Sequence, residues 1–278
     1  MKAAAVQMTS TRDVRRNLAD AGELIREAAE QGAELVVLPE NFSFLGATDA
    51  ERQAAVEPWG DGPAQRFLAE AAERHGVWLV GGTIPILDKE RGDRGERPSS
   101  RSLLLAPDGR IVAHYDKIHL FDVDASAGTS GRAAEPYKES ASTLAGERVV
   151  SAATPLGRIG LTICYDIRFP ALFHRLSVLG VDVLAVPAAF TVPTGQVHWQ
   201  PLLQARAIES LVYVVAAGQC GEHAGGRKTY GHSMVIGPWG EILGELENDP
   251  GVLCVDLDMI RLSQLRESFP VVRHRRDL

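Results

Sequence analysis

The chain has 278 residues, of which 45% are hydrophobic and 23% are charged, and its formal net charge is −7 at pH 7. This length allows a large hydrophobic core that needs no metal ion or disulfide bond to hold it together. The negative charge, with no long basic run, argues against nucleic acid or an anionic membrane as the partner.

The first part of the chain alternates predicted strands and helices. Short apolar runs indicate the strands, apolar residues at helical spacing indicate the helices, and Gly32 and Gly76 are placed to end those helices. In chain order we predict a strand at 3–7, a helix from 14 to Gly32, a strand at 35–39, a helix from 61–63 to Gly76 and a strand at 77–82. This order favours helices packed on a sheet.

A hairpin and two loops come next. Residues 102–106 and 110–114 flank the turn signal Pro107-Asp108-Gly109 and predict a hairpin. Residues 88–100 are charged and rich in glycine, and residues 125–136 are small and polar, so both segments are predicted loops.

The second half repeats the order of the first. We predict a strand at 159–164, a helix at 170–179, a strand at 183–187, a helix at 197–209, a strand at 213–217, a hairpin of 233–236 with 241–246, a strand at 252–257, a short helix and a basic tail at 273–276. No Pro/Ser-rich linker separates the halves. We therefore expect one domain, residues 1–278, with two packed sheets and helices outside.

The cysteines and the N-terminus indicate the cellular compartment in which we expect the protein. The three cysteines, Cys164, Cys220 and Cys254, are far apart and form no Cys-x-x-Cys pair, which favours a reducing environment over a disulfide framework. The start lacks the apolar stretch of a signal peptide, and no apolar run approaches the roughly 18 residues of a membrane span. We expect a soluble, cytoplasmic protein.

Three segments share one build, a predicted strand that ends on a reactive side chain. Leu35-Val-Val-Leu-Pro-Glu40 ends on a carboxylate, Ile111-Val-Ala-His-Tyr-Asp-Lys117 on an ammonium, and Arg158-Ile-Gly-Leu-Thr-Ile-Cys164 on a thiol. A thiol at the exit of a buried strand, before a turn toward a helix, is held rigidly and still exposed. Together the three ends suggest one cysteine-hydrolase site.

The thiol needs a base, because the thiolate is the nucleophile and a free cysteine has a pKa of roughly 8.5. A histidine is the usual base, and His119, His198 and His232 are candidates that spacing alone does not place beside Cys164. Glu40 is the alternative, since burial behind a proline would raise its proton affinity toward the working pH.

The other charged groups have roles in the same chemistry. Attack on an amide or nitrile carbon builds negative charge, which the Lys117 ammonium and the backbone N–H of Tyr165 would stabilise. Glu139 would hold Lys117 or assist proton transfer to the leaving amine. Such a site requires neither a metal ion nor an organic cofactor.

Other kinds of site are disfavoured. His119, Asp122 and Asp124 do not set up a closed set of metal ligands. Gly81-Gly82 is not followed by the Gly-Lys-Ser/Thr of a phosphate loop, and Tyr230-Gly-His-Ser233 does not match a serine nucleophile elbow.

Nearly the whole chain resembles the nitrilase superfamily of carbon–nitrogen hydrolases. The resemblance rests on three signatures in the right order, namely Leu38-Pro-Glu40, Tyr115-Asp-Lys-Ile-His-Leu-Phe121 and Ile163-Cys-Tyr-Asp-Ile-Arg-Phe-Pro170. It implies a four-layer α-β-β-α sandwich of two mixed sheets, a homodimer or larger homo-oligomer, and a Glu40–Lys117–Cys164 triad. It also implies a second glutamate, at Glu139.

Within that superfamily the chain is most similar to the Nit branch of small-molecule amidases. The similarity lies in residues 198–209, in Tyr213-Val-Val-Ala-Ala-Gly-Gln219 and in Tyr230-Gly-His-Ser-Met234. It implies hydrolysis of the ω-amide of a small 2-oxo acid, of the deaminated-glutathione or 2-oxoglutaramate kind, to a carboxylate and ammonia through a thioester.

Three further residues are candidates for binding the substrate. Arg168, one helical turn past the nucleophile, would pair with the substrate carboxylate, or alternatively with Asp166 or a helix end. The resemblance adds Phe190 and Thr194, which match pocket positions in the loop after the strand at 183–187. Trp199 and the C-terminal segment are candidates for subunit contacts. The alternative functions are a nitrilase or N-carbamoyl amidohydrolase with the same triad, and a catalytically silent interaction protein.

Overall fold

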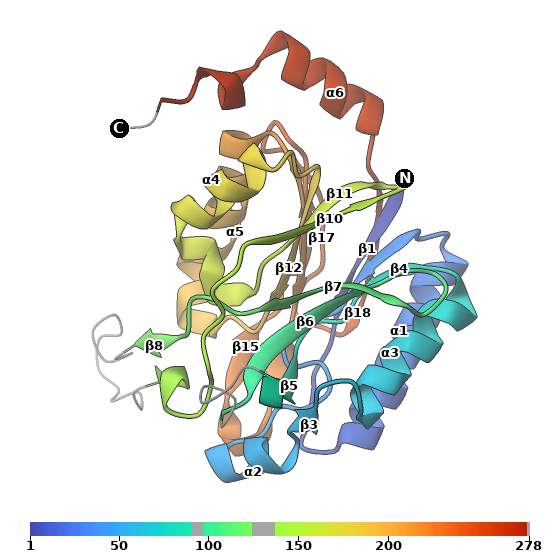
Figure 1. The fold of residues 1–278 in the computed structure, drawn as a ribbon, viewed down its shortest axis with the longest axis vertical. Helices are drawn as coiled ribbons and strands as arrows, with labels where there is room; N and C mark the ends of the chain where they lie inside the picture. Colours follow the sequence, from blue (N-terminus) through green and yellow to red (C-terminus); the bar gives the residue numbers. More distant parts are fainter. Residues whose placement is uncertain (91–96, 124–136, 277–278) are drawn as a thin grey trace.

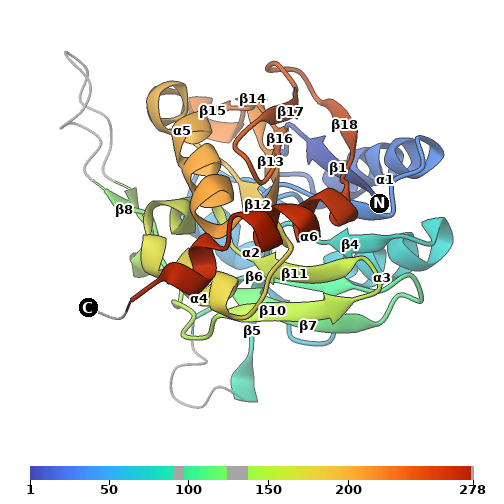
Figure 2. The same ribbon diagram turned by 90° about the horizontal axis from the view of Figure 1, so that it is seen from above.

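The computed structural model describes residues 1–90, 97–123 and 137–276. In these ranges the chain forms four layers, with a pair of helices on the outer face of each of two sheets (Figure 1; Figure 2). The predicted α-β-β-α sandwich is therefore confirmed. The predicted loop at 125–136 and Asp124 lie outside the described residues.

The first sheet has the strand order β18-β1-β2-β4-β6-β5-β3, with β7 paired to β6. Its strands are β1 (Lys2–Gln7), β2 (Leu35–Val37), β3 (Glu57–Pro58), β4 (Trp78–Val80), β5 (Ile84–Leu87), β6 (Ser99–Leu105), β7 (Ile111–Asp116) and β18 (Gly251–Asp256). Strands β1, β2 and β4 are parallel, and β18 returns from the C-terminal part to pair antiparallel with β1.

The second sheet has the order β10-β11-β12-β13-β16-β17. Its strands are β10 (Val150–Thr154), β11 (Gly157–Leu161), β12 (Val183–Ala188), β13 (Tyr213–Gly218), β16 (Met234–Ile236) and β17 (Ile242–Glu245). Strands β11, β12 and β13 are parallel, as β1, β2 and β4 are in the first sheet. The two halves are thus similar, as expected, because each sheet contains three parallel strands in its middle.

Helices α1 and α3 cover the first sheet, and α4 and α5 cover the second (Figure 2). The helices are α1 (Val14–Glu30), α2 (Asp49–Ala54), α3 (Pro63–His75), α4 (Pro170–Val178), α5 (Val192–Ser210) and α6 (Met259–Ser268). Two short hairpins, β8 (Asp122–Val123) with β9 (Tyr137–Lys138) and β14 (Cys220–Glu222) with β15 (Lys228–Tyr230), complete the described elements.

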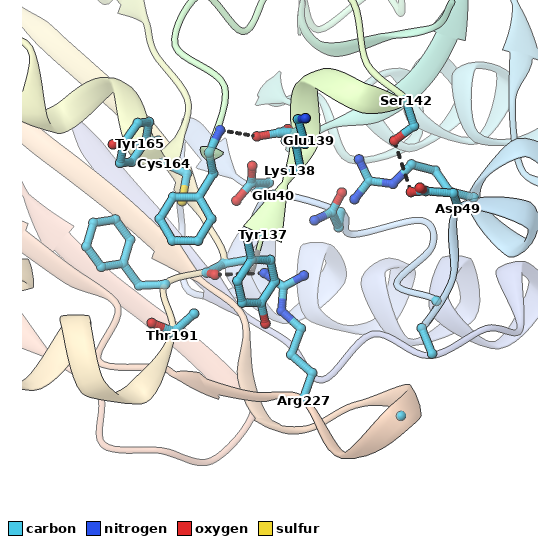
Figure 3. A pocket seen from close by; sticks show the side chains of 18 of the residues that line it. Glu40, Asp49, Tyr137, Lys138, Glu139, Ser142, Cys164, Tyr165, Thr191 and Arg227 are labelled. Carbon is cyan, nitrogen blue, oxygen red and sulfur yellow. Dashed lines mark hydrogen bonds between the residues drawn. The ribbon is translucent and has the colours of Figure 1, made fainter. Parts of the chain in front are cut away.

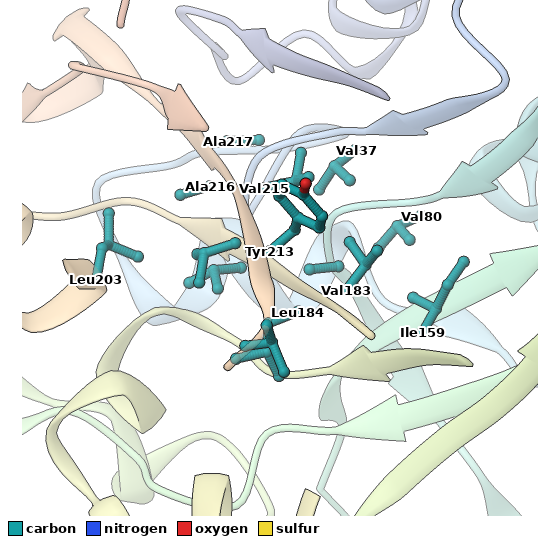
Figure 4. Close-up of a cluster of buried hydrophobic side chains, with 14 of the residues drawn as sticks. Val37, Val80, Ile159, Val183, Leu184, Leu203, Tyr213, Val215, Ala216 and Ala217 are labelled. Atoms are coloured by element: carbon teal, nitrogen blue, oxygen red, sulfur yellow. The ribbon is translucent and has the colours of Figure 1, made fainter. Parts of the chain in front are cut away.

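Successive side chains along a strand point to opposite faces of the sheet and so enter two different hydrophobic cores. On β1, Ala3 and Ala5 join the core between the sheets, whereas Ala4 and Val6 join the core under α1 and α3. Figure 4 shows the first core, with Leu203 of α5 on the opposite side of β12 and β13 from the first-sheet valines. Because strands in the middle layers are buried on both faces, they appear in the sequence as continuous apolar runs.

The carboxyl ends of the parallel strands meet at one end of the sandwich. Met8, which follows β1, forms a parallel bridge with Gln219, which follows β13. In open α/β sheets this edge is where ligands bind. The three reactive side chains predicted at strand ends are therefore brought toward the same place.

Several elements differ from the predictions. Helix α2 has no buried residue, so periodicity did not indicate it, although Thr48 and Glu51 form the capping box that starts it. Helix α5 begins at Val192 and not at 197, so Thr194 lies in its first turn and not in a loop. The short strands β3, β5, β10, β14 and β15 were also not predicted.

Candidate active site

Glu40, Lys117 and Cys164 meet at the carboxyl ends of β2, β7 and β11. Lys117 Nζ lies 2.8 Å from Glu40 Oε1, and the Cys164 thiol lies beside the Glu40 carboxylate in the same pocket. The three residues are 4%, 2% and 8% exposed in the order Glu40, Lys117, Cys164. The structure thus brings together the carboxylate, the ammonium and the thiol singled out in the sequence.

Glu139 completes the group from a separate segment. It begins the short 3₁₀ turn Glu139–Ala141, and its Oε2 accepts hydrogen bonds from Lys117 Nζ at 2.9 Å and from the Phe121 N–H at 2.7 Å. Lys117 therefore lies between two carboxylates. Of the two roles considered for Glu139, the geometry directly supports holding Lys117 in place.

Local backbone features fix the ends of the strands. Cys164 has a φ of 46° at the start of the 3₁₀ turn Cys164–Arg168, a left-handed conformation that turns the chain sharply after β11. Gly82, with a φ of 49°, packs so closely behind Pro39 that a Cβ would lie 2.1 Å from the Pro39 carbonyl oxygen. The segment that ends in Glu40 is thus supported by a position that only glycine fits.

The charges in this group determine where the protons reside. Burial would raise the pKa of Glu40, but the charge and hydrogen bond of Lys117 lower it below its ordinary value. The prediction of a net rise in the proton affinity of Glu40 toward the working pH is therefore wrong, because it did not include an ammonium at contact distance. The carboxylate is ionised at neutral pH.

The pKa values of the thiol and of the amine are raised, whereas that of Glu40 is lowered. Burial, followed by the negative charge of Glu40, raises the pKa of Cys164 well above its ordinary value. For Lys117, burial lowers the pKa, but the charges of Glu139 and Glu40 outweigh burial and raise it. The resting site therefore holds a neutral thiol beside an ionised carboxylate and an ammonium.

The three histidine candidates are engaged elsewhere. His119 Nδ1 lies 2.7 Å from Asp166 Oδ1, His198 Nδ1 lies 3.2 Å from Arg168 Nη1, and His232 Nδ1 lies 2.7 Å from Glu245 Oε1. Glu40 is the base candidate that touches the thiol. Of the candidates left open by the sequence, the geometry favours the carboxylate.

An open pocket of about 860 Å³ leads to this group (Figure 3). Its walls include the other residues proposed from the sequence: Tyr165, Arg168, Phe190 and Thr194. The guanidinium of Arg168 stands over the rings of Tyr165 and Phe190, at 5.7 Å and 5.4 Å from their centroids. Asp166 is hydrogen-bonded to other groups, so the alternative pairing of Arg168 with Asp166 is not observed.

A search for related proteins shows the family of the chain. The carbon-nitrogen hydrolase family model matches residues 2–267. The chain belongs to the carbon-nitrogen hydrolase family. The prediction of an amidase-type hydrolase of non-peptide carbon–nitrogen bonds is confirmed at this level, and so is the nitrilase-like fold.

Relatives of this carbon-nitrogen hydrolase extend over its full length. It is 44% identical over 276 residues to a deaminated glutathione amidase from Synechocystis sp., covering 98% of this chain and 97% of that one. Among solved structures it is similar to Saccharomyces cerevisiae Nit3, with a TM-score of 0.85 and 30% identity over 100% of this chain and 97% of that chain. It is also similar to the C. elegans NitFhit protein, with a TM-score of 0.86 and 36% identity, where 99% of this chain covers 65% of that longer chain.

Sequence reasoning did not propose several of the residues that line the pocket of this hydrolase. Asn41, Arg52, Tyr137 and Arg227 also line the pocket. Asn41 directly follows Glu40 and has a φ of 59°, and Arg227 precedes the Tyr230-Gly-His-Ser segment that carried the Nit resemblance. Those positions were the available signals, whereas nothing in the local pattern around Arg52 pointed to a site.

Of the residues considered for a metal site, Asp124 lies outside the described residues, and His119 and Asp122 make other contacts. Among the described residues, no group of three or more His, Cys, Asp or Glu side chains could hold a metal ion. Asp122 accepts a hydrogen bond from the Ser140 N–H, and His119 stacks on Phe169 with ring centroids 3.7 Å apart. In the same part of the chain, no helix is both long enough and apolar enough to cross a membrane.

Proposed function

We propose that this enzyme hydrolyses the ω-amide of a small 2-oxo acid, with deaminated glutathione as its substrate, through a thioester on Cys164. The observation that carries the proposal is the meeting of Glu40, Lys117 and Cys164 at the base of one pocket. The full-length similarity to deaminated glutathione amidases supports the substrate.

The first half-reaction forms the thioester. As the sulfur attacks the amide carbon, the thiol proton moves to Glu40, which is already ionised and lies beside the thiol. The oxyanion is stabilised by the Lys117 ammonium and the Tyr165 N–H. When the carbon–nitrogen bond breaks, Glu40 returns its proton to the leaving nitrogen.

The second half-reaction consumes water. Glu40 takes a proton from water, the hydroxide adds to the thioester carbon, and the carbon–sulfur bond breaks with return of the proton to sulfur. The products are the acid and an amine, which is ammonia from a primary amide and cysteinylglycine from deaminated glutathione. Glu139 keeps Lys117 oriented throughout, and Arg168 binds the carboxylate of the 2-oxo acid while Phe190 and Thr194 shape the pocket.

The test is turnover by the wild-type enzyme and by Cys164→Ala, with Cys254→Ala as the control. We expect wild type and Cys254→Ala to release 2-oxoglutarate from deaminated glutathione, and Cys164→Ala to lose turnover while keeping its thermal melting temperature. Retained hydrolysis in Cys164→Ala would place the nucleophile elsewhere. Carbon dioxide released from an N-carbamoyl compound in preference to amide hydrolysis would support the carbamoylase alternative.

Labelling separates an enzyme from a silent interaction protein. With iodoacetamide, we expect Cys164 to react faster than Cys220 and Cys254, because it alone of the three lines the pocket in the described chain. Equal labelling of all three thiols would favour the silent protein. Mass spectrometry of the digested protein measures the three rates together.

We also propose that the enzyme is a cytoplasmic homodimer or larger homo-oligomer. Large apolar side chains are exposed on α4, α5, α6 and nearby loops: Val178, Val197, Ile208, Trp239, Ile260 and Phe269. Trp199 does not belong to this surface, because it is 1% exposed and its indole N–H donates to the His232 carbonyl. Light scattering on a sizing column should give a dimer or larger, and a monomer at micromolar concentration would contradict the proposal.

A further inference from the structure

The pocket carries more positive charge than the reaction centre needs. Among the described residues its lining has five cationic side chains, Arg52, Lys117, Lys138, Arg168 and Arg227, and three carboxylates, Glu40, Asp49 and Glu139. Lys117 is held between Glu40 and Glu139, and the other four cations share the pocket lining with one further carboxylate, Asp49. In a chain of net charge −7, this local excess favours an anionic substrate with more than one charged group.

Two of these cations share one wall although they are far apart in the sequence. Arg52 lies on α2, and Arg227 lies just before β15. Both line the main pocket and also a smaller recess beside it, together with Asn41 and Gly46. The two guanidiniums therefore lie near each other at one end of the pocket.

Neither guanidinium has a carboxylate at ion-pair distance among the residues that the structure describes. Arg52 Nη1 donates to Thr143 Oγ1 at 3.3 Å, and Arg227 Nη2 donates to the Ala189 carbonyl at 3.4 Å. The Nε of Arg227 is buried, and within those same ranges it has no hydrogen-bond partner. The acid on α2, Asp49, accepts instead from Ser142 Oγ at 3.0 Å.

A fully buried arginine elsewhere in the fold has carboxylate partners. Arg101 pairs with Asp88 at 3.0 Å and with Asp116 at 2.7 Å. A guanidinium in a pocket wall without a carboxylate partner has N–H groups that are free to bind a planar anion. A carboxylate accepts two parallel hydrogen bonds from such a guanidinium. The unpaired donors of Arg52 and Arg227 thus point to a carboxylate of the substrate.

The position of Arg227 indicates which end of the substrate it meets. Ala189 accepts from Arg227 through its carbonyl and contacts Cys164 through its N–H. The ring of Tyr137 lies 5.2 Å from the Arg227 guanidinium, and Figure 3 shows Arg227 beside Tyr137, across the pocket from Tyr165. Arg168, which stands over Tyr165, therefore serves a different part of the substrate from Arg227.

We infer that Arg52 and Arg227 form an anion subsite for a carboxylate on the leaving amine. The inference rests on the proposed function and makes it narrower: the preferred amides are those whose nitrogen carries a short peptide with a free C-terminal carboxylate. Deaminated glutathione fits, because its leaving group is cysteinylglycine. The primary amide 2-oxoglutaramate has the same acyl group but releases ammonia, so it gains nothing from this subsite.

These two substrates give a matched test. We expect Arg52→Gln and Arg227→Gln each to lower the ratio of kcat/KM for deaminated glutathione over 2-oxoglutaramate by about 10- to 100-fold, mainly through KM. Arg168→Gln, which affects the shared acyl group, should lower both values and leave the ratio nearly constant. Arg110→Gln, an exposed arginine of the β6–β7 turn, is the control and should leave the ratio unchanged.

A change in the substrate tests the subsite without altering the protein. For wild type, replacing the C-terminal carboxylate of deaminated glutathione by a carboxamide should lower kcat/KM by the same factor as the arginine substitutions do. Arg227→Gln should lower kcat/KM for this carboxamide only a little further. Equal losses on both substrates in the arginine variants, or full activity on the carboxamide, would overturn the inference.

Binding separates this inference from the proposed function. Calorimetry with Cys164→Ala should show deaminated glutathione binding that Arg227→Gln weakens at least about tenfold. If Arg227→Gln weakened binding but wild type did not hydrolyse deaminated glutathione, the subsite would be supported and the proposed function refuted. Turnover with no effect of either arginine would retain the function and refute the subsite.

Discussion

The hydroxyl of Tyr115 donates a hydrogen bond to Asp166 Oδ2 at 2.8 Å, and this contact joins the strand that carries Lys117 to the turn that carries Cys164. Asp166 is fully buried and also accepts from the N–H groups of Ile163, at 2.9 Å, and His119, at 3.1 Å. The residues two positions before and two positions after Lys117, and the residue before Cys164, thus share one carboxylate. We expect Asp166 to fix the distance between the two reactive groups.

Replacing Asp166 tests this link. Asp166→Ala leaves several buried donors unpaired, and since each costs about 1–3 kcal/mol, we expect a loss of roughly 3–5 kcal/mol in the free energy of unfolding together with a lower kcat. Asp166→Asn keeps an acceptor and should recover part of both. Urea unfolding and steady-state kinetics measure the two effects.

The control for this series is Asp20→Ala, which removes an exposed carboxylate on α1. It should change stability by no more than about 0.5 kcal/mol. An Asp166→Ala enzyme as stable and as active as the control would show that the shared carboxylate does not position the site.

Removing the ammonium should disable the base as well as the oxyanion contact. In Lys117→Met, the main influence that opposes burial of Glu40 is removed, so the pKa of that carboxyl rises and a smaller fraction is ionised at neutral pH. We expect kcat/KM to fall by at least about 10²–10³, the cost of losing one oxyanion donor. Lys228→Met, an exposed lysine on β15, should keep its activity, and a wild-type rate in Lys117→Met would refute the assigned role.

The depressed pKa of Glu40 predicts how stability depends on pH. The folded-state pKa lies below the ordinary value of 4.5, so the unfolded chain takes up this proton first as the pH falls. The contribution of ionised Glu40 is therefore complete above the unfolded pKa and is lost as the pH falls through the folded value. The free energy of unfolding of wild type minus that of Glu40→Gln should be constant at neutral pH and decrease below 4.5.

Urea unfolding at a series of pH values measures this difference. Subtracting the variant removes the contributions of the other carboxylates to first order. A difference that grew as the pH fell would mean that Glu40 is protonated more easily in the folded state, and the proposed ionised base would then be wrong.

The sequence predicted the reactive side chains because each ends a short apolar run. Glu40 and Cys164 follow β2 and β11, which are wholly or partly buried, and Lys117 follows β7, which is only partly buried but has a turn signal before it. Such strands can be recognised in a sequence without any knowledge of their partners. The protonation states could not be read in the same way. The pKa of Glu40 depends on the 2.8 Å contact with Lys117, which is 77 residues away in the chain.

The unpredicted parts of the site lie on elements with weak local signals. Arg52 is on a six-residue helix without a buried side chain, and Arg227 is in a turn before a three-residue strand. Their place in the pocket follows from how the loops at the strand ends pack, which periodicity does not encode. The first turn of α5, Val192-Pro-Thr-Gly, is also poor in helix formers, so the helix that carries Thr194 was placed too late.

A glycine behind Lys117 offers a purely steric test of the site. The Gly146 N–H donates to the Lys117 carbonyl at 2.8 Å, and a Cβ on Gly146 would lie 2.1 Å from the Asp116 carbonyl oxygen. Gly146→Ala must therefore push the end of β7, and with it the ammonium that lies between Glu40 and Glu139. We expect kcat to fall by about 10²-fold, the cost of a displacement of roughly 1 Å, with the largest effect on the chemical step.

The matched control is Gly32→Ala, at the end of α1, where no atom lies within 4 Å of the added Cβ but the φ of 84° is strained for alanine. This variant should lose stability and keep its kcat, because Gly32 is remote from the pocket. Comparing the two variants by urea unfolding and kcat separates backbone strain from displacement of the site. If Gly146→Ala lost only stability, the close packing behind Lys117 would serve the fold and not the position of the ammonium.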